Sequence, residues 1–549
     1  MRRIKSTRAI NATGKGRASI GQLLAVAGVT AGLTTSAVAE SVLRVGMTAA
    51  DIPVNIGQPD QGFEGFRFMG YMLYDALVLW DLSKDKESAK LVPGLAESWE
   101  IDPKNDKRWI FKLRKGVTFH DGSPFTADDV VWNFAKVKDD KAPQYEAKQA
   151  ALVAVRIPAL SAVNKIDDYT VEILTSKPSA YVPYQVSFWF MSSQEHWQKT
   201  KSWAEFAKSP SGTGPWKFVS QTQRAKVEMV PNKAYWNKAR IPKVDRVILR
   251  PIPEASARVA ALLSGQVDFI EAPPPDSIDR LKSAGMKIIT NAYPHNWAVT
   301  LSRIPGSPWN DIRVRKAANL CIDREGLNKL LGGLSIPAKG HMPPGDAWFG
   351  KPTFEIGYKP DEARKLMTEA GFTAAKPLPI KWAISTSGSG QMQPLPMFEF
   401  VQANLNECHF KLEAEVMEWN ALTAFSRKPA DDKEAVAKGV DGIIVSRALQ
   451  DPYSAFERVF HSARISPAGS NWGKLKLPVY DELLAKASLT FDKELQDEVL
   501  RKVHETAVDN AEWVWVTHDV NPRALSPKVE GFVQAKSWFQ DLTPITLKK

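Results

Sequence analysis

Apolar and polar positions recur along the chain with periods that predict strands in some segments and helices in others. Residues 41–49 (SVLRVGMTA) alternate in the way typical of a strand that enters a sheet. Residues 311–331 instead carry apolar side chains at helical spacing. In the second half of the chain, predicted strands and helices follow each other in turn, as they do in a parallel α/β sheet. The pattern therefore predicts an α/β protein.

The segment 111–134 (FKLRKGVTFHDGSPFTADDVVWNF) brings several potentially catalytic side chains close together in sequence. His120, Asp121 and Asp129 raise two alternatives: a metal or general-base site, or a turn between a strand and a helix. Asp-Gly and Ser-Pro are turn-forming pairs. Thr126 and Asp129 have the spacing of a helix capping box, and no further metal ligand follows at a compatible spacing. We therefore interpret the segment as a turn followed by the start of a helix.

The first 39 residues have the composition of a secretory signal. Positions 1–19 hold six basic residues and no acidic residue, and the apolar stretch that follows ends in Ala37-Val38-Ala39. A basic region, an apolar core and small residues before the cleavage point are typical of export signals. A membrane anchor is the alternative, but the apolar core is short and interrupted by glycine and threonine. We expect cleavage after Ala39 and a mature protein outside the cytoplasm.

Composition and charge narrow the range of functions. The 549 residues, 44% of them apolar, suffice for two or three packed domains. The formal net charge of +11 includes the six basic residues of the leader, so the remaining chain carries +5. This charge is spread along the sequence without a basic stripe interleaved with aromatic residues, which argues against nucleic-acid binding. The two cysteines, Cys321 and Cys408, can form a disulfide or can both be small buried side chains.

The sequence carries no recognisable catalytic or cofactor motif. Its eight histidines are scattered and form no HExxH pair, and no GxSxG segment is present. The glycine-rich segments match neither a phosphate loop nor a dinucleotide fingerprint. We therefore expect a binding protein without a cofactor, and a hydrolase that uses paired carboxylates is the alternative.

Several segments, taken in order, resemble a known family. They are LVPGLAESWEI (91–101), KRWIFKLRKGVTFHDGSPFTADDVVWNF (107–134), GTGPWKF (212–218), DIRVRKAANLCIDREGL (311–327) and YKPDEARKLMTEAGF (358–372). Together they resemble the periplasmic solute-binding proteins of dipeptide, oligopeptide and nickel ABC importers. The resemblance implies a two-lobed, hinged fold of mixed sheets flanked by helices, with an enlarged first lobe. Lobe one would comprise residues 40–291 and 513–549, and lobe two residues 292–512. It also implies a monomer that closes on a solute and delivers it to a membrane permease.

The resemblance also gives an expectation about the solute. In peptide-binding members, a carboxylate four residues before a proline binds the α-ammonium group of the peptide. In the matching stretch VSRALQDPYSAF (445–456), this position falls on Ala448, and the position of a family aromatic residue falls on Val445. Alanine cannot neutralise a buried ammonium group, and an unpaired buried charge is costly. We expect a peptide or peptide-like solute, with an opine, a sugar or another non-peptide solute as alternatives.

Candidate ligand contacts follow from the same alignment and from side-chain chemistry. Arg447 could bind a carboxylate or phosphate through paired hydrogen bonds, or it could be a surface residue. Asp451 is expected to be a turn carboxylate first and a ligand contact second. The remaining candidates are one residue near the end of the first predicted strand and four aromatic residues that could stack on a ring or pack in the core: Thr48, Trp297, Trp348, Tyr453 and Trp472.

Two further functions remain as alternatives within the same fold. A periplasmic chaperone or a sensory receptor could use the same lobes without serving an importer. Nickel or haem binding would also fit the family, but His295 and His341 are too isolated in sequence to support it.

Overall fold

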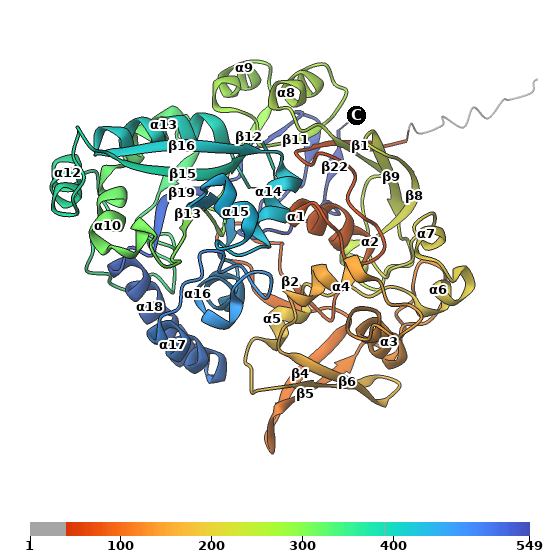
Figure 1. Cartoon of the computed structure of the whole chain (residues 1–549). Coiled ribbons are helices and arrows are strands. Elements are labelled where there is room, and N and C mark those ends of the chain that lie inside the picture. Colours follow the sequence, from red (N-terminus) through yellow and green to blue (C-terminus); the bar gives the residue numbers. More distant parts are fainter. Residues whose placement is uncertain (1–39, 389, 549) are drawn as a thin grey trace, which may run out of the picture. The chain divides into compact units, whose positions relative to one another are not determined.

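The computed structural model describes residues 40–388 and 390–548 (Figure 1). The predicted export signal and its cleavage point at Ala39 lie outside these residues. Within them, no helix combines the length and the apolar character needed to cross a bilayer.

The first of two large sheets has seven strands of mixed direction. β1 follows directly from the alternating segment at residue 41, and its Leu43, Val45 and Met47 side chains are fully buried. β1 pairs in parallel with both β10 and β11, whereas the outer strands are antiparallel. In spatial order the strands are β12 (Lys287–Ile289), β20 (Arg523–Leu525), β11 (Phe269–Glu271), β1 (Val42–Met47), β10 (Arg246–Pro251), β9 (Lys226–Pro231) and β8 (Trp216–Thr222).

The second large sheet is also mixed. β15 pairs in parallel with β16 and β17, while β13 is antiparallel to its neighbours β17 and β19. A purely parallel arrangement in this half, which the alternation of elements suggested, is therefore wrong for β13, β14 and β19. The spatial order is β14 (Ser335–Pro337), β19 (Trp513–Asp519), β13 (His295–Leu301), β17 (Gly442–Ile444), β15 (Leu378–Ser385) and β16 (Phe410–Met417), and the short β18 (Arg447–Ala448) also pairs with β13.

The chain connects the two large sheets twice. It passes from β12 of the first sheet to β13 of the second, and it returns from β19 to β20. Each sheet has its own hydrophobic core, one around β1 and one around Trp297, Val299 and Ile384. The two sheets are therefore built around different cores and joined by two short connections.

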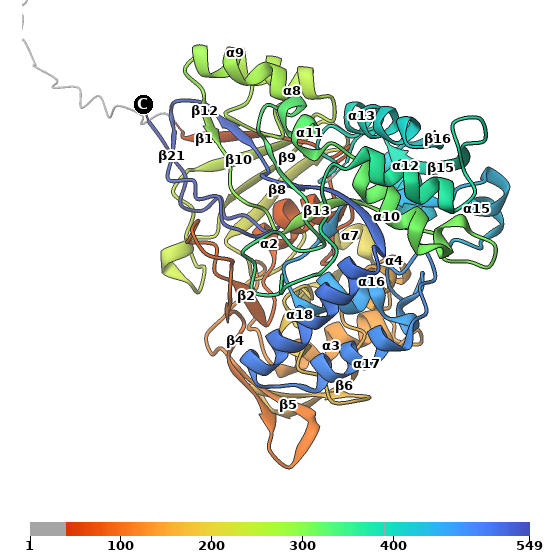
Figure 2. The ribbon, with the colours of Figure 1, turned by 90° about the vertical axis from the view of Figure 1, so that its left-hand side faces the viewer.

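A third sheet of four antiparallel strands enlarges the N-terminal half and lies at the bottom of Figures 1 and 2. Its strands are β4 (Ala96–Asp102), β5 (Asn105–Leu113), β7 (Thr170–Thr175) and β6 (Leu160–Asp167). The helix α3 (Ala127–Lys138) contacts β6 and begins with the expected capping box, in which Asp129 accepts from the Thr126 amide at 3.0 Å. The His120 ring forms a hydrogen bond with the Gly214 carbonyl through Nε2 at 3.0 Å. The interpretation of this segment as a turn before a helix is confirmed.

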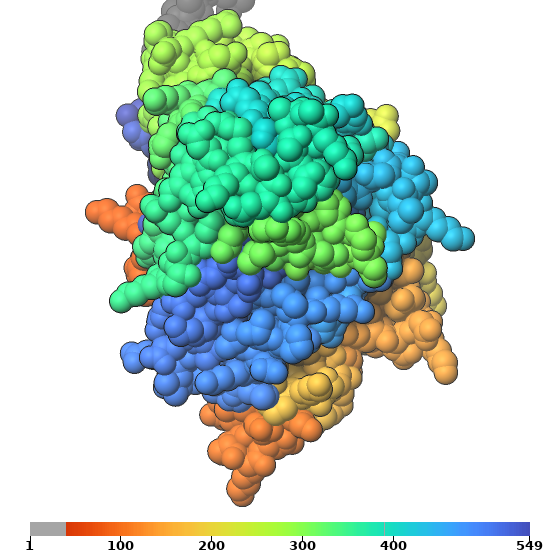
Figure 3. Space-filling view, turned by 60° about the vertical axis from the view of Figure 1, so that its left-hand side comes forward, coloured from red at the N-terminus to blue at the C-terminus, as the bar shows by residue number. Residues whose placement is uncertain are grey.

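Helices surround both large sheets. In Figures 1 and 2, α8 (Ala255–Leu263) and α9 (Ile278–Ser283) lie beside β11 and β12 at the top of the molecule. In Figure 3, the green-to-teal surface of the segments around α10, α12 and α13 lies above the blue surface of α17 and α18. The helices that pack beside the second sheet or follow it are α10 (Ile312–Cys321), α11 (Arg324–Leu330), α12 (Pro360–Glu369), α13 (Pro394–Glu407), α14 (Trp419–Ser426), α17 (Pro478–Leu489) and α18 (Lys493–Asp509).

A disulfide bond joins Cys321 and Cys408, which decides between the two alternatives for these residues. Cys321 is the last residue of α10, and Cys408 directly follows α13. Both side chains are buried in the core of the second sheet. The bond therefore links two helices whose residues lie 87 positions apart in the sequence.

Candidate functional site

A cavity of about 440 Å³ lies where the carboxyl ends of strands from both large sheets meet. Its lining includes Thr48 directly after β1, Glu271 at the end of β11, Thr386 directly after β15 and Asp519 at the end of β19. Open α/β sheets bind ligands outside the carboxyl ends of their strands. The volume falls within the range of roughly 300–1,000 Å³ that is typical of small-molecule sites. Its place in the fold and its size make this cavity the candidate site.

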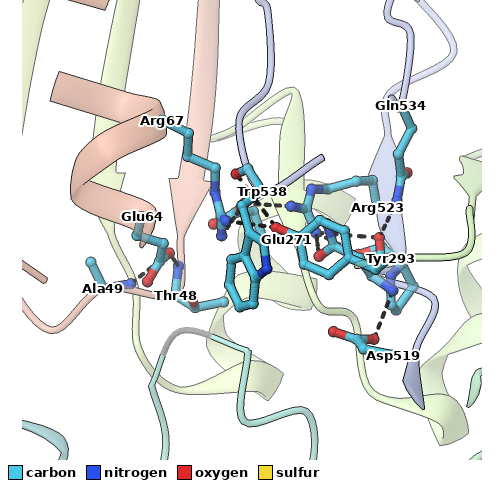
Figure 4. Close-up of polar contacts among 12 residues, drawn as sticks. Thr48, Ala49, Glu64, Arg67, Glu271, Tyr293, Asp519, Arg523, Gln534 and Trp538 are labelled. Atoms are coloured by element: carbon cyan, nitrogen blue, oxygen red, sulfur yellow. Dashed lines mark hydrogen bonds and ion pairs between the residues drawn. The ribbon is translucent and has the colours of Figure 1, made fainter. Parts of the chain in front are cut away.

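The charged groups of the cavity centre on Glu271, whose side chain is buried between two guanidinium groups (Figure 4). Glu271 Oε1 lies 2.9 Å from Arg67 Nη2 and 2.8 Å from Arg523 Nη2. Arg67 comes from the π-helical turn η1 (Phe66–Gly70), and Arg523 is the first residue of β20. Arg67 Nη1 also donates a hydrogen bond to the Tyr293 hydroxyl at 3.1 Å. Burial would raise the pKa of Glu271, but the two guanidinium groups outweigh it, so the pKa is lowered and the carboxylate is ionised.

A second carboxyl group, that of Glu64, lies beside Glu271 and is in the opposite protonation state. Glu64 Oε1 accepts from the backbone amides of Thr48 at 2.7 Å and Ala49 at 3.0 Å, which fixes the turn after β1. Burial, and then the negative charge of Glu271, raises the pKa of Glu64. Two neighbouring buried carboxyls cannot both ionise at low cost, so Glu64 holds a proton at neutral pH while Glu271 is charged.

Two more polar groups shape the floor of the cavity. Arg258 donates from Nε to the Glu271 carbonyl and from Nη2 to the Ala272 carbonyl, each at 3.0 Å, which holds the backbone at the end of β11. Asp519 Oδ1 accepts from the Asn521 amide at 2.7 Å in the connection from β19 to β20. Burial raises the pKa of Asp519 to about 6. Charged groups of the first sheet and of the returning connection therefore face the same space.

The wall that the second sheet contributes is mostly apolar. Leu331, Leu334, Met392 and Leu395 line it, together with the loop that follows β15. Gly390 of this loop has φ +71°, and a Cβ there would lie 2.7 Å from the Trp538 ring and 2.9 Å from the His295 ring. Glycine is therefore required, because the backbone approaches these rings closely. Apolar walls over a floor of fixed charged groups are typical of sites that bind small molecules with polar ends.

Of the predicted site residues, Thr48 lines this cavity and the four aromatic residues do not. Trp297 is fully buried in the core of the second sheet, and Trp472 is fully buried beside Phe425. Trp348 packs in another core, where its Nε1 donates to Asp497 Oδ1 at 2.6 Å. These placements correspond to the core-packing alternative.

The segment 445–458 holds the other predicted residues and lies against the end of α4 (Ala147–Ala154). The Tyr453 hydroxyl donates to the Val155 carbonyl at 3.0 Å. Asp451 Oδ1 accepts from the Ser454 amide at 2.8 Å, as expected of a turn carboxylate. Ala448 and Arg447 form β18, and Arg447 Nη2 lies 3.5 Å from the Thr300 hydroxyl. Arg447 and Asp451 are absent from the lining of the cavity described above.

Sequence reasoning missed Arg67, Glu271 and Arg523. A usable signal was present for two of them, since Arg67 is the lone charge in GFRFMGYM (65–72) and Glu271 ends the apolar strand of VDFIEAP (267–273). A charged residue inside an apolar segment is expected to be paired when that segment is buried. Among residues 40–388 and 390–548, no group of three or more His, Cys, Asp or Glu side chains is arranged to hold a metal ion.

Comparisons with known proteins place this geometry in context. The family model described as "Bacterial extracellular solute-binding proteins, family 5 Middle" matches residues 90–466. Heme-binding protein A of Haemophilus influenzae is 28% identical over 474 residues, which cover 82% of this chain and 83% of that protein.

Solved structures have the same fold. The dipeptide-binding protein of Pseudoalteromonas sp. SM9913, in complex with Met-Leu, matches with a TM-score of 0.79 and 21% identity over 92% of this chain and 100% of its own. The binding protein MoaA of A. tumefacien R10, in complex with mannopinic acid, matches with a TM-score of 0.75 and 22% identity over 93% and 100%. These likenesses confirm the predicted α/β fold of the periplasmic binding proteins.

Proposed function

We propose that this chain, which belongs to the bacterial extracellular solute-binding proteins of family 5, captures a peptide or peptide-like solute for an ABC importer. It would act in the periplasm as a monomer and deliver the solute to the membrane permease. The observation that carries the proposal is the cavity at the carboxyl ends of strands from both large sheets. A solute bound there would touch both sheets at once.

The mechanism rests on two lobes, residues 40–291 with about 520–549 and residues 292–519, because β19 (Trp513–Asp519) pairs within the second sheet and the expected boundary at residue 513 therefore moves to the end of this strand. Two short connections between sheets with different cores support a hinge, because few backbone dihedrals need to change for one lobe to rotate against the other. A solute that contacts both lobes binds the closed form better than the open form, and it stabilises closure by that difference in affinity. The permease would then recognise the closed form. No bond is made or broken in the solute.

A non-peptide solute such as an opine is the second candidate. It is supported by Ala448, since the position that the family resemblance assigns to the ammonium-binding carboxylate has no charge. A structural relative in complex with mannopinic acid shows that the same fold accommodates such a compound. Dipeptides and opines both carry carboxylates, so they share the part of the solute that an arginine can bind.

The decisive experiment identifies the solute by mass and then tests the cavity. Native mass spectrometry of the freshly purified protein would weigh any bound molecule, and calorimetry with that compound or with a set of dipeptides would measure its affinity. Thr386→Trp places a large ring in the cavity lining and should weaken binding at least tenfold. Thr368→Trp is the matched control, because Thr368 lies on the exposed side of α12.

Two results would contradict the proposal. Binding that is unaffected by Thr386→Trp would place the solute elsewhere, and a bound solute that is recovered with a changed mass after prolonged incubation would indicate a hydrolase.

A further inference from the structure

A contact between the third sheet and the helix pair α17–α18 involves neither the cavity nor the two connections between the large sheets. The loop after β7, residues 176–181, reaches α17, where the Ala180 amide donates to the Ser488 carbonyl at 2.8 Å. Neither residue is part of the cavity lining. Figure 3 shows the blue surface of the helix pair directly above the yellow and orange surface of the N-terminal half. With the lobe boundaries of the proposed function, this contact joins lobe one to lobe two.

Tyr181, the residue before α5 (Val182–Val186), is buried in the second lobe and not in its own. Its side chain is fully buried and belongs to a hydrophobic core whose other buried members all lie between residues 298 and 515. Leu484 and Ala487 of α17 are among these members. The next residue along the chain, Val182, packs instead in the core of the third sheet. Tyr181 therefore inserts from one lobe into the core of the other.

Trp109 of β5 holds this loop and adds a ring contact of its own. Its Nε1 donates to the Ser179 carbonyl at 3.1 Å, which fixes the loop beside the third sheet. The ring centre of Trp109 lies 6.0 Å from that of Phe491, which is in the turn between α17 and α18. Phe491 is 40% exposed, so this ring contact lies at the surface and can separate without opening the core of either lobe.

The hydroxyl group of Tyr181 opposes the contact that its ring makes. The hydroxyl is buried and has no hydrogen-bond partner among residues 40–388 and 390–548. Burial raises its pKa well above the usual value, so the group is a neutral hydroxyl without hydration. A buried polar group that lacks a partner disfavours the state in which it is buried, whereas the apolar part of the ring favours that state. The ring and the hydroxyl therefore act in opposite directions on the association of the two lobes.

We propose that Tyr181 sets how readily the two lobes close, although it lies outside the lining of the cavity. This inference rests on the proposed function, because it requires that the lobes separate at the hinge. In the open form the Tyr181 hydroxyl is hydrated, and closure removes this hydration without supplying a partner. The apparent affinity for a solute is reduced in proportion to the fraction of empty protein that is closed. The hydroxyl thus favours the open form and release of the solute, while the ring stabilises the closed form.

The test measures closure of the empty mature chain and needs no solute. In the double variant Ala180→Cys/Ser488→Cys, only the contact carries free thiols, because the two native cysteines form a disulfide. A short bismaleimide joins these thiols when the lobes close, and mass spectrometry follows the cross-linked fraction. In this background we expect Tyr181→Phe to speed cross-linking at least about threefold, and Tyr181→Ala, which removes the buried ring, to slow it by a similar factor. Tyr358→Phe, at a half-exposed tyrosine, should leave the rate unchanged.

Equal cross-linking rates in the two Tyr181 variants and their parent would overturn the proposal. X-ray scattering gives a second measure, because the cross-linked protein should have a smaller radius of gyration than the empty wild type. Equal radii would make the contact permanent, and Tyr181→Phe would then raise the unfolding midpoint of the empty protein without changing the cross-linking rate. Native mass spectrometry separates this inference from the function. A solute captured by a protein whose closure ignores Tyr181 would refute the inference alone, whereas closure without any captured solute would count against the function.

Discussion

The disulfide between Cys321 and Cys408 allows the cost of its removal to be calculated from the sequence separation. Because the bond closes a loop across 87 positions, it removes conformational freedom mainly from the unfolded chain. The chain-entropy relation gives about 15 cal/mol/K for such a loop, or about 4.6 kcal/mol at 25 °C. We therefore expect the double variant Cys321→Ala/Cys408→Ala, and the wild type treated with a reductant, to unfold at lower urea concentration.

Urea titration followed by tryptophan fluorescence measures this effect, because Trp309 and Trp382 lie in the same core as the disulfide and contribute to the signal of the 18 tryptophans. For an m-value of about 2–3 kcal/mol/M, the midpoint should fall by about 1.5–2.3 M. Reduction of the wild type is the control for the variant, since it breaks the bond without removing the sulfur atoms. A decrease of the midpoint by less than about 0.5 M, both for the variant and for the reduced wild type, would refute the reasoning and imply that the unfolded chain is already compact around this loop.

Three other predictions concern single side chains. Glu271→Gln should lower the free energy of unfolding by about 3–5 kcal/mol, because it leaves two buried guanidinium groups without their carboxylate. Glu64→Gln replaces a protonated acid and should lower the free energy of unfolding by less than about 1 kcal/mol. Urea titration at pH 7 compares the two variants, and equal losses of stability would contradict the assigned protonation states. Burial lowers the pKa of His341 to about 3, so the stability that this residue contributes is complete above pH 6.5 and decreases as the pH falls toward 3. Between pH 7.5 and 5, the wild type should lose about 2 kcal/mol more than His341→Gln, and parallel curves would count against a neutral buried imidazole. Tyr453→Phe removes the hydrogen bond to the Val155 carbonyl and should weaken solute binding by about 0.5–1.5 kcal/mol, as measured by calorimetry. An unchanged affinity would contradict this prediction and would mean that the contact is equally present in the open form.

Local features of the fold could be predicted from the sequence because their causes are local. Alternation over residues 41–49 predicts β1, and the spacing of Thr126 and Asp129 predicts the start of α3. Each depends on contacts between residues that are close in sequence. The direction of β13 and β19 could not be predicted in the same way, since strand pairing depends on partners more than a hundred residues apart.

The candidate site illustrates the same limit. The group around Glu271 is assembled from residues 67, 271 and 523, which come together only when η1, β11 and β20 take their places around the first sheet. No spacing within any one segment reports such a group. The four aromatic candidates were identified from the sequence but do not line the cavity. A large aromatic side chain suits a core as well as a pocket, and its neighbours in the folded chain decide between the two. Arg447 was singled out for its chemistry, but its position in β18, away from the lining of the cavity, is a property of the folded chain.

The position of β20 has a consequence for the order in which the molecule can assemble. This strand lies between β11 and β12, yet residues 523–525 are made after every strand of the second sheet. β12 has no other partner in the sheet, so it stays unattached until almost the whole polypeptide has been synthesised. A chain that is threaded through a translocation channel N-terminus first would thus keep its leading half unfinished during passage. Such a delay favours transport in an extended form, because β12 gains its partner strand only when β20 has been made.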